Sequence, residues 1–228
     1  MAEPNAHRRI AILFDIDGTL IVSGGAGGAA WRRAFEELYG VPADIGQYTD
    51  AGMTDPEVGR LTFERVVGRE PSAKELARLL SMRSRYLPEA VAESRGYKVL
   101  PGVPETLARL SSEGYLLGLT TGGVESAAHI KLERADLNRY FTFGGYGSDS
   151  PDRTELTRRA VERAETIVGH ELARDQVLVV GDTPLDVTAA HAAGALGVGV
   201  ASGHYTKEEL RAAGADFVLG SLEEELPL

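Results

Sequence analysis

A short apolar run that ends in two aspartates and a glycine constrains the fold of this chain more than any other feature. Residues 10–13 are Ile-Ala-Ile-Leu, and Phe14-Asp15-Ile16-Asp17-Gly18-Thr19-Leu20 follows directly. Such a run is typical of a buried parallel strand, and open α/β folds bind ligands at the carboxyl ends of these strands. Alternate residues of an extended strand share a face, so Asp15 and Asp17 can approach one substrate.

A second cluster of acids follows another apolar run. Val177-Leu178-Val179-Val180 leads into Gly181-Asp182-Thr183-Pro184-Leu185-Asp186. Thr183 before Pro184 is typical of a helix N-terminus, which predicts Asp182 in the strand-to-helix loop and Asp186 in the first helical turn. Both acids can then face the sheet edge that carries Asp15. A helix dipole alone would explain Asp186, but it does not explain Asp182.

Four carboxylates at one sheet edge predict a bound cation, because their mutual repulsion would otherwise shift their protonation. The chain contains no cysteine. Ligation by carboxylate and carbonyl oxygens favours Mg²⁺. Zinc is not expected, because the five histidines stand singly and without ligand spacing.

Three stretches resemble motifs of the haloacid dehalogenase superfamily, most of whose members are phosphatases. Asp15-Ile16-Asp17-Gly18-Thr19 is similar to the first motif, and the stretch from Gly181 to Asp186 is similar to the fourth. Thr121, at the end of the apolar run 116–121, matches the Ser or Thr of the second motif. The resemblance extends from about residue 10 to the end of the chain and is greatest for the capped branch that includes phosphoglycolate phosphatases and β-phosphoglucomutases.

The resemblance implies a role for each of these residues. Asp15 would be the nucleophile that takes the phosphoryl group, and Asp17 would protonate the leaving oxygen and then activate water. Thr121 would hydrogen-bond the phosphoryl group. Mg²⁺ would be held by Asp15, the main-chain carbonyl of Asp17 and Asp182, with Asp186 supporting the site indirectly or through water.

The third motif of the family, a lysine ahead of the helix before the fourth motif, departs from the pattern. The stretch Ser148-Asp149-Ser150-Pro151-Asp152-Arg153-Thr154-Glu155 contains no lysine. We expect Arg153 to supply the positive charge, from the loop or the first helical turn near the sheet edge. Lys131 competes for this role. It stands ten residues past Thr121, however, on a predicted helix that would lead away from the edge by roughly 15 Å.

The chain is predicted to be an α/β core interrupted by a helical insert. The core is a Rossmann-like parallel sheet with helices on both faces, formed by residues 1–22 and 97–228, and residues 23–96 form a helical cap. The glycine-rich stretch 24–28 is predicted to be a flexible hinge. It lacks the Lys-Ser/Thr that follows in a nucleotide-binding loop, so no nucleotide cofactor is expected.

Individual elements follow from capping signals and apolar runs. Cap helices are predicted over 29–39, from Asp55 before Pro56, and after the capping box of Ser72 and Glu75. Thr54, Asp55 and Arg60 of the cap are candidate substrate contacts, although Asp55 is equally explained as a helix cap and Arg60 as a surface charge. Core strands are predicted at 97–100, 115–120, 141–143, 177–180, 196–200 and 216–219.

Composition limits the classes of partner. A hydrophobic content of 43% with 25% charged residues is ordinary for a globular protein. A net charge of −10 and a pI near 5.1 disfavour nucleic acid and acidic membranes. No apolar run reaches signal or membrane-spanning length, which predicts a cytoplasmic protein. The expected partner is a small phosphorylated metabolite, and the sequence does not indicate an oligomeric state.

The predicted activity is Mg²⁺-dependent hydrolysis of a phosphomonoester through an aspartyl-phosphate. The motifs do not separate this activity from a sugar phosphomutase. A dehalogenase is disfavoured, because that branch keeps no acid at the position of Asp17. A receiver-type signalling domain, from a different class, also combines clustered acids, Mg²⁺ and an aspartyl-phosphate. The cap-sized insert and the acid at Asp17 count against it.

Overall fold

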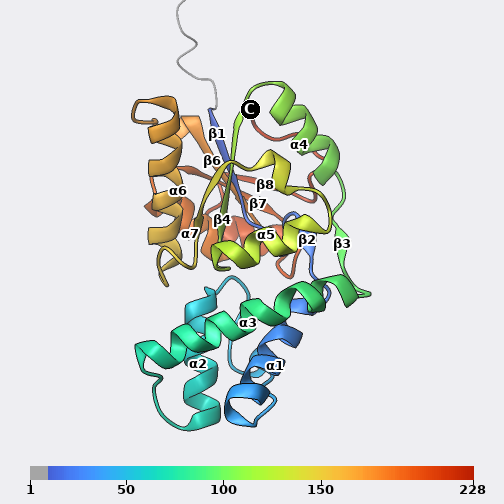
Figure 1. Ribbon diagram of the computed structural model, residues 1–228. Coiled ribbons are helices and arrows are strands. Elements are labelled where there is room, and N and C mark those ends of the chain that lie inside the picture. The colour runs from blue at the N-terminus through green and yellow to red at the C-terminus, as the bar shows by residue number, and fades with distance from the viewer. Residues whose placement is uncertain (1–9) are drawn as a thin grey trace, which may run out of the picture.

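The fold, seen in a computed structural model that describes residues 10–228, is a parallel sheet with helices on both faces and a group of helices beyond one edge (Figure 1). The sheet has six strands in the order β5-β4-β1-β6-β7-β8, and all of its pairings are parallel. Its strands are β1 (Ala11–Phe14), β4 (Leu116–Thr121), β5 (Phe143–Tyr146), β6 (Val177–Gly181), β7 (Leu196–Val200) and β8 (Phe217–Leu219). The predicted Rossmann-like α/β fold is confirmed.

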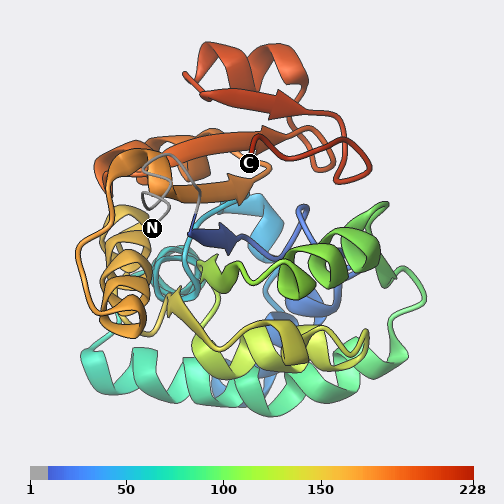
Figure 2. The ribbon, with the colours of Figure 1, turned by 90° about the horizontal axis from the view of Figure 1, so that it is seen from above.

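Helices connect most of these strands and cover both faces of the sheet (Figure 2). The helices beside the sheet are α4 (Val103–Ser112), α5 (Glu125–Glu133), α6 (Arg153–Val168), α7 (Pro184–Ala192) and α8 (Lys207–Ala212). In the described part of the chain, no helix combines the length and the apolar character needed to cross a membrane.

The central strand β1 explains why the sheet forms, because its four residues are fully buried on alternating sides. Ile12 and Phe14 pack in the cluster that includes residues of α4 and α5, whereas Ala11 and Leu13 pack with residues of α6. Burial on both faces is the reason for an uninterrupted apolar run. Shortening one of these side chains, as in Leu13→Ala, is expected to cost about 2–5 kcal/mol.

The register of the sheet aligns the carboxyl ends of β1, β4 and β6, which carry the acids and the threonine of the motifs. Phe14 at the end of β1 stands opposite Leu119 of β4 and Val180 of β6. The Asp15 N–H then donates to the Val180 carbonyl (2.9 Å). Residues that directly follow β1, β4 and β6 therefore meet at one edge of the sheet.

Strand β5 starts two residues later and ends three residues later than the predicted strand 141–143. The glycines at 144 and 145 weaken the strand signal in the sequence, but the packing requires Gly145. A Cβ at this position would overlap the backbone carbonyl of Leu156 in α6. The close approach of strand and helix, which the sequence pattern does not reveal, is what the glycine provides.

The predicted core strand at 97–100 is wrong. Lys98–Val99 forms a two-residue strand, β3, which pairs antiparallel with β2 (Ile21–Val22) outside the parallel sheet. These two short strands are the stretches through which the chain leaves the core and returns to it. Their pairing explains the apolar character of Val99, which packs against the core cluster.

The glycine-rich stretch 24–28 differs in part from the predicted flexible hinge, because α1 (Ala26–Tyr39) already includes Gly27 and Gly28. Gly24 is held by close packing. Its φ is +61°, and a Cβ would overlap the backbone of Gly96 on the returning linker. The Ser94 hydroxyl donates to the carbonyls of Ser23 and Gly24, each at 3.0 Å. The two linkers therefore cross in direct contact.

Three helices lie beyond the carboxyl ends of the strands (Figure 1). They are α1, α2 (Asp55–Val67) and α3 (Ala73–Glu93), and their shared core includes Trp31, Phe35, Phe63 and Leu79. The predicted capping box opens α3: the Ser72 N–H donates to Glu75 (2.9 Å), and the Glu75 N–H donates to the Ser72 hydroxyl (3.3 Å).

Candidate active site

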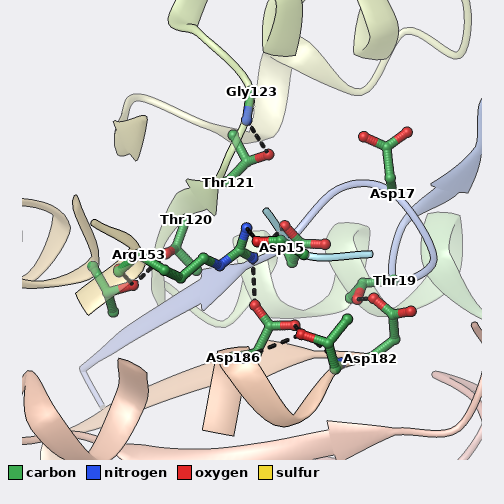
Figure 3. Close-up of polar contacts among 12 residues, drawn as sticks. Asp15, Asp17, Thr19, Thr120, Thr121, Gly123, Arg153, Asp182 and Asp186 are labelled. Atoms are coloured by element: carbon green, nitrogen blue, oxygen red, sulfur yellow. Dashed lines mark hydrogen bonds and ion pairs between the residues drawn. The ribbon is translucent and has the colours of Figure 1, made fainter. Parts of the chain in front are cut away.

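Three aspartates from two strand ends meet at the edge of the sheet that faces these helices (Figure 3). Asp15 follows β1, Asp182 follows β6 and Asp186 lies in the first turn of α7. One carboxylate oxygen of each lies within 4.8 Å of those of the other two, and all three residues are buried. Asp17 is a fourth acid of this edge, but its side chain points away from the three (Figure 3).

The N-terminus of α7 fixes the side chain of Asp186. One carboxylate oxygen, Oδ2, accepts hydrogen bonds from the Thr183 N–H (3.0 Å) and the Thr183 hydroxyl (2.8 Å). The Asp186 N–H donates in return to the Thr183 hydroxyl (3.3 Å), which completes a capping box. The other oxygen, Oδ1, pairs with Arg153. Asp186 is thereby rigid, and both of its oxygens already have partners.

Asp182 accepts a side-chain hydrogen bond from Thr19, and the backbone of two loops packs closely against its carboxylate. The Thr19 hydroxyl donates to its Oδ1 (3.3 Å). Gly18 has a φ of +90°, and a Cβ there or at Gly203 would overlap the Asp182 carboxylate. Only glycine fits at these two positions, since the loop after β1 and the loop after β7 both close on this carboxylate.

The three acids repel one another in a site that water barely reaches. Burial, opposed by Arg153 and assisted by the charge of Asp186, raises the pKa of Asp15 to about 7. Burial, together with the charges of Asp15 and Asp186, raises the pKa of Asp182 to about 8. A cation among these oxygens would relieve the repulsion. The buried cluster could therefore bind a metal ion.

Arg153, the first residue of α6, is the cation inside the cluster. Its guanidinium donates to Asp15 Oδ1 (2.7 Å) and to Asp186. These two carboxylates raise the pKa of Arg153 against the opposing effect of burial, so the group stays protonated. Two buried threonines fix the helix that carries it: the Thr157 hydroxyl donates to the Arg153 carbonyl (2.9 Å) and lies 2.8 Å from the Thr120 hydroxyl.

Lys131 also lies at the site, which overturns its predicted distance from the sheet edge. The predicted distance assumes that the helix begins directly after Thr121, but Gly122 and Gly123 lie in a loop and α5 starts only at Glu125. The helix runs between the sheet edge and α3 (Figure 1). The buried Lys131 ammonium pairs with the Asp17 carboxylate. Lys131 stands four residues after Ala127 and three after Ala128, both of which are buried. This helical spacing predicts that Lys131 lies on the same buried face of α5.

Thr121 and Asp17 form the wall of the site above the three acids. Thr121 is buried at the end of β4, and its hydroxyl accepts from the Gly123 N–H (3.3 Å). The side chain of Asp17 pairs with Lys131 but is 41% exposed, so its carboxylate is accessible from the site. Both residues lie at the sheet edge that their motifs predict.

A cavity of about 410 Å³ opens over these groups. Core residues from the loops after β1, β4, β6 and β7 line one side, and residues 51–53 and Asp55 line the other. Of the three candidate cap contacts, only Asp55 belongs to the lining. Thr54 caps α2 and donates to the Pro151 carbonyl (2.9 Å), whereas Arg60 pairs with Glu57 and Glu64 on the same helix.

Some residues of the site carry no signal in the sequence. The Gly52 carbonyl accepts from Arg153 (3.3 Å), and the Ser202 hydroxyl donates to the Gly18 carbonyl (2.7 Å). Both contacts join stretches far apart in the chain, so no local pattern could reveal them.

Most of the chain, including the three acids at this edge of the sheet, matches a known protein family. The family model of haloacid dehalogenase-like hydrolases matches residues 11–194, which include the residues of the site described above except Ser202 and Gly203. The chain belongs to this family. It is accordingly a hydrolase, and the resemblance of the three sequence motifs is confirmed at the level of the family.

Similar proteins agree with the assignment to haloacid dehalogenase-like hydrolases. The phosphoglycolate phosphatase of Escherichia coli K12 is 28% identical over 235 residues, which cover 95% of this chain and 90% of that protein. A hydrolase from Pseudomonas syringae is 26% identical with a TM-score of 0.68, over 94% of each chain. CbbY from Rhodobacter sphaeroides, solved in complex with phosphate, shares the fold with a TM-score of 0.71 at 20% identity, over 94% of this chain and 95% of that one.

Proposed function

We propose that this hydrolase is a Mg²⁺-dependent phosphatase of small phosphomonoesters that works through an aspartyl-phosphate on Asp15. The observation that carries the proposal is the buried cluster of Asp15, Asp182 and Asp186, in which Arg153 pairs with Asp15 and Asp186. Asp15 and Asp182 line the cavity together with Asp17 and Thr121. The family match and the phosphatase relatives support this activity.

The donor set fits a magnesium ion. Asp15 and Asp182 are buried carboxylates whose pKa values are raised by burial and by neighbouring acids. Together with the main-chain carbonyl of Asp17 they would provide the oxygen ligands that Mg²⁺ prefers, while Asp186 holds Arg153 and the start of α7. When bound, the ion neutralises phosphate charge and helps to align the phosphoryl group with its nucleophile.

In the first step, a carboxylate oxygen of Asp15 attacks phosphorus and the bond to the leaving oxygen breaks. Arg153 holds Oδ1 of Asp15, so Oδ2 is the candidate attacking oxygen. The Thr121 hydroxyl would hydrogen-bond the phosphoryl oxygens, and Asp17 in its acid form would give a proton to the leaving oxygen. Alignment of these groups before reaction supplies much of the acceleration.

In the second step, water attacks the phosphorus of the aspartyl-phosphate and Asp15 is released. Asp17, now a carboxylate, would accept the proton of this water. Its partial exposure suits both steps, because the same side chain must meet first the leaving group and then a water molecule that replaces it.

We further propose that residues 23–96 act as a cap domain that covers the cavity and contributes to substrate choice. Their helices lie over the carboxyl edge of the sheet (Figure 1), and residues 51–53 and Asp55 line the cavity. The cytoplasmic location remains a prediction from the sequence.

A substrate panel tests the proposed activity. Release of phosphate from phosphoglycolate, sugar phosphates and nucleoside monophosphates is measured with Mg²⁺ and with EDTA, and the relatives make phosphoglycolate the first compound to try. Asp15→Asn serves as the control, because it removes the attacking carboxylate while keeping nearly the same volume. A tenth or more of the wild-type rate in this variant would rule out Asp15 as the nucleophile.

The same panel addresses the alternatives. Conversion of a sugar phosphate into its isomer, without net release of phosphate, would indicate a phosphomutase. The receiver-type alternative has no support from the family match, which spans the core and the insert.

A further inference from the structure

Asp55 joins the helical insert to the core at a point next to the candidate active site. Its N–H donates to the Gly122 carbonyl (2.7 Å), and its carboxylate oxygen Oδ2 accepts from the Val124 N–H (2.9 Å). Gly122 directly follows Thr121, and Val124 is the residue at which α5 begins to wind. One residue of the insert therefore holds both ends of the loop between β4 and α5.

The carboxylate of Asp55 is held in turn by a buried arginine of α3. Arg83 Nη1 lies 3.0 Å from Asp55 Oδ2, and the Arg83 side chain is 2% exposed. The Trp31 ring lies beside the guanidinium, with its centroid 5.7 Å away. Such a buried cation keeps a carboxylate in place, because moving the carboxylate would leave the arginine without a counter-charge.

The core helix α5 has no N-terminal cap of its own. Its capping residue is Val124, whose side chain cannot accept a hydrogen bond. The Asp55 carboxylate supplies the acceptor and a negative charge at the positive end of the helix. The next N–H, that of Glu125, donates to the Ser148 hydroxyl of the core (3.2 Å). The N-terminus of α5 is therefore completed by one acceptor from the core and one from the insert.

The backbones of the insert and the core pack closely beside the contact between Asp55 and α5. A Cβ at Gly122 would lie 2.5 Å from the Met53 carbonyl oxygen, so the two backbones already touch. Helix α5 carries Lys131, whose ammonium pairs with Asp17. A shift of α5 or of the loop before it would move Lys131 on one side and Thr121 on the other.

We propose that Asp55 is a positioning residue: seated by Arg83, it caps α5 from the insert and thereby fixes Lys131 and Thr121 in the active site. This inference rests on the proposed phosphatase function for its kinetic consequence only. The insert then does more than cover the cavity, because seating it completes a helix of the core.

The test replaces the Val124 N–H and leaves Asp55, Arg83 and the residues that line the cavity unsubstituted. The Cδ of a proline at position 124 takes the place of the proton and also displaces the Asp55 carboxylate, which breaks the same contact. Val124 has a φ of −65°, which proline adopts without strain. Val124→Pro deletes the donor, and Val124→Ala is the matched control that shortens the side chain but keeps the N–H. Both variants are compared with the wild-type chain in kinetics on the best substrate of the panel, hydrogen exchange of residues 125–133 and thermal melting.

Loss of a helix cap should speed exchange in residues 125–133 by about fivefold in Val124→Pro relative to Val124→Ala. Misplacement of groups in the site should lower kcat by on the order of tenfold, with KM changed by less than about threefold. A purely structural role would lower the melting temperature and leave kcat of the folded enzyme unchanged, which would overturn the proposal. Equal exchange in the two variants would also overturn it.

If the wild-type chain releases no phosphate from any compound, the proposed function fails, and the exchange comparison alone decides whether Asp55 orders α5. If Val124→Pro does not fold, Asp55→Ala combined with Arg83→Met breaks the same hydrogen bond from the insert without leaving a buried charge unpaired. Its control is Glu89→Gln, which loses an ion pair with Arg33 inside the insert.

Discussion

Two cations serve this site in physically different ways, although both pair with an acid of the first motif. Arg153 bridges Asp15 and Asp186 in a place where all three side chains are nearly inaccessible. Lys131 pairs with Asp17, whose side chain is 41% exposed. Desolvation makes the first arrangement costly to break, whereas water screens the second. The residue with the larger effect on folding is therefore expected to be Arg153.

Replacing each cation by methionine should separate these effects. Arg153→Met leaves two buried carboxylates without their partner and should lower the free energy of unfolding by about 3–5 kcal/mol. Lys131→Met should lower it by less than about 1 kcal/mol and yet reduce kcat, because Asp17 loses the group that holds it. Urea unfolding and steady-state kinetics measure the two quantities. Equal losses of stability would contradict this division.

In the proposed mechanism Asp17 moves the protons of both steps, and Asp17→Asn tests this role. With a sugar phosphate, whose leaving oxygen needs a proton, formation of the phospho-enzyme should slow by about 10²- to 10⁴-fold. With an activated aryl phosphate the first step should survive, and phospho-enzyme should accumulate because no base activates water. Acid quench and mass spectrometry of single turnovers detect it. Equal losses on both substrates without phospho-enzyme would exclude Asp17 as the acid and base.

At the scale of elements, strands with apolar runs were predictable and close approaches were not. The runs that became β1, β4, β6 and β7 are buried on both faces, so their sequences show them directly. The predicted position of strand β5 was wrong because Gly145 is required by the close approach of helix α6. No local sequence pattern encodes that approach. Lys131 was misplaced for a related reason, since two glycines delay the start of α5.

Two glycine-to-alanine substitutions test this distinction between glycines. At Gly145 a Cβ would overlap the Leu156 carbonyl, so Gly145→Ala must push α6, and Arg153 with it, away from the sheet. Its expected cost is about 1–3 kcal/mol, with a loss of activity. At Gly27, inside α1, nothing lies within 4 Å of the added carbon. Gly27→Ala should therefore stabilise the protein by up to about 1 kcal/mol. Destabilisation by both would contradict the packing described for them.

At the scale of the whole molecule, the fold brings together buried carboxylates whose mutual repulsion opposes folding when no metal ion is bound. The candidate ligands come from the first and fourth motifs, which 167 positions separate between Asp15 and Asp182. Each motif could be found in the sequence, because each follows its own strand. Their mutual distance, their burial and the resulting repulsion depend on the register of the sheet, and only the structure reveals them.

Burial of these acids, together with their repulsion, should make the stability of the metal-free protein fall as the pH rises. In the folded chain the pKa of Asp15 is raised to about 7 and that of Asp182 to about 8, while the unfolded chain titrates near 4. Between about pH 5 and 8 the folded state therefore binds more protons than the unfolded state. Stability is highest below this window and decreases across it, by up to about 1.4 kcal/mol per pH unit for each proton involved.

Bound Mg²⁺ should flatten this dependence, because carboxylates that hold the ion stay ionised in the folded state. Urea unfolding from pH 5 to 8.5, with EDTA and with saturating Mg²⁺, measures both profiles. Acids whose pKa is lowered by folding, such as Asp149 and Asp216, titrate below this window and do not disturb the comparison. Asp182→Asn removes one of the two raised groups, so its profile in EDTA should be shallower than that of the wild type. The same steep profile in that variant, or identical wild-type profiles with and without Mg²⁺, would show that this cluster is neither the source of the pH dependence nor the metal site.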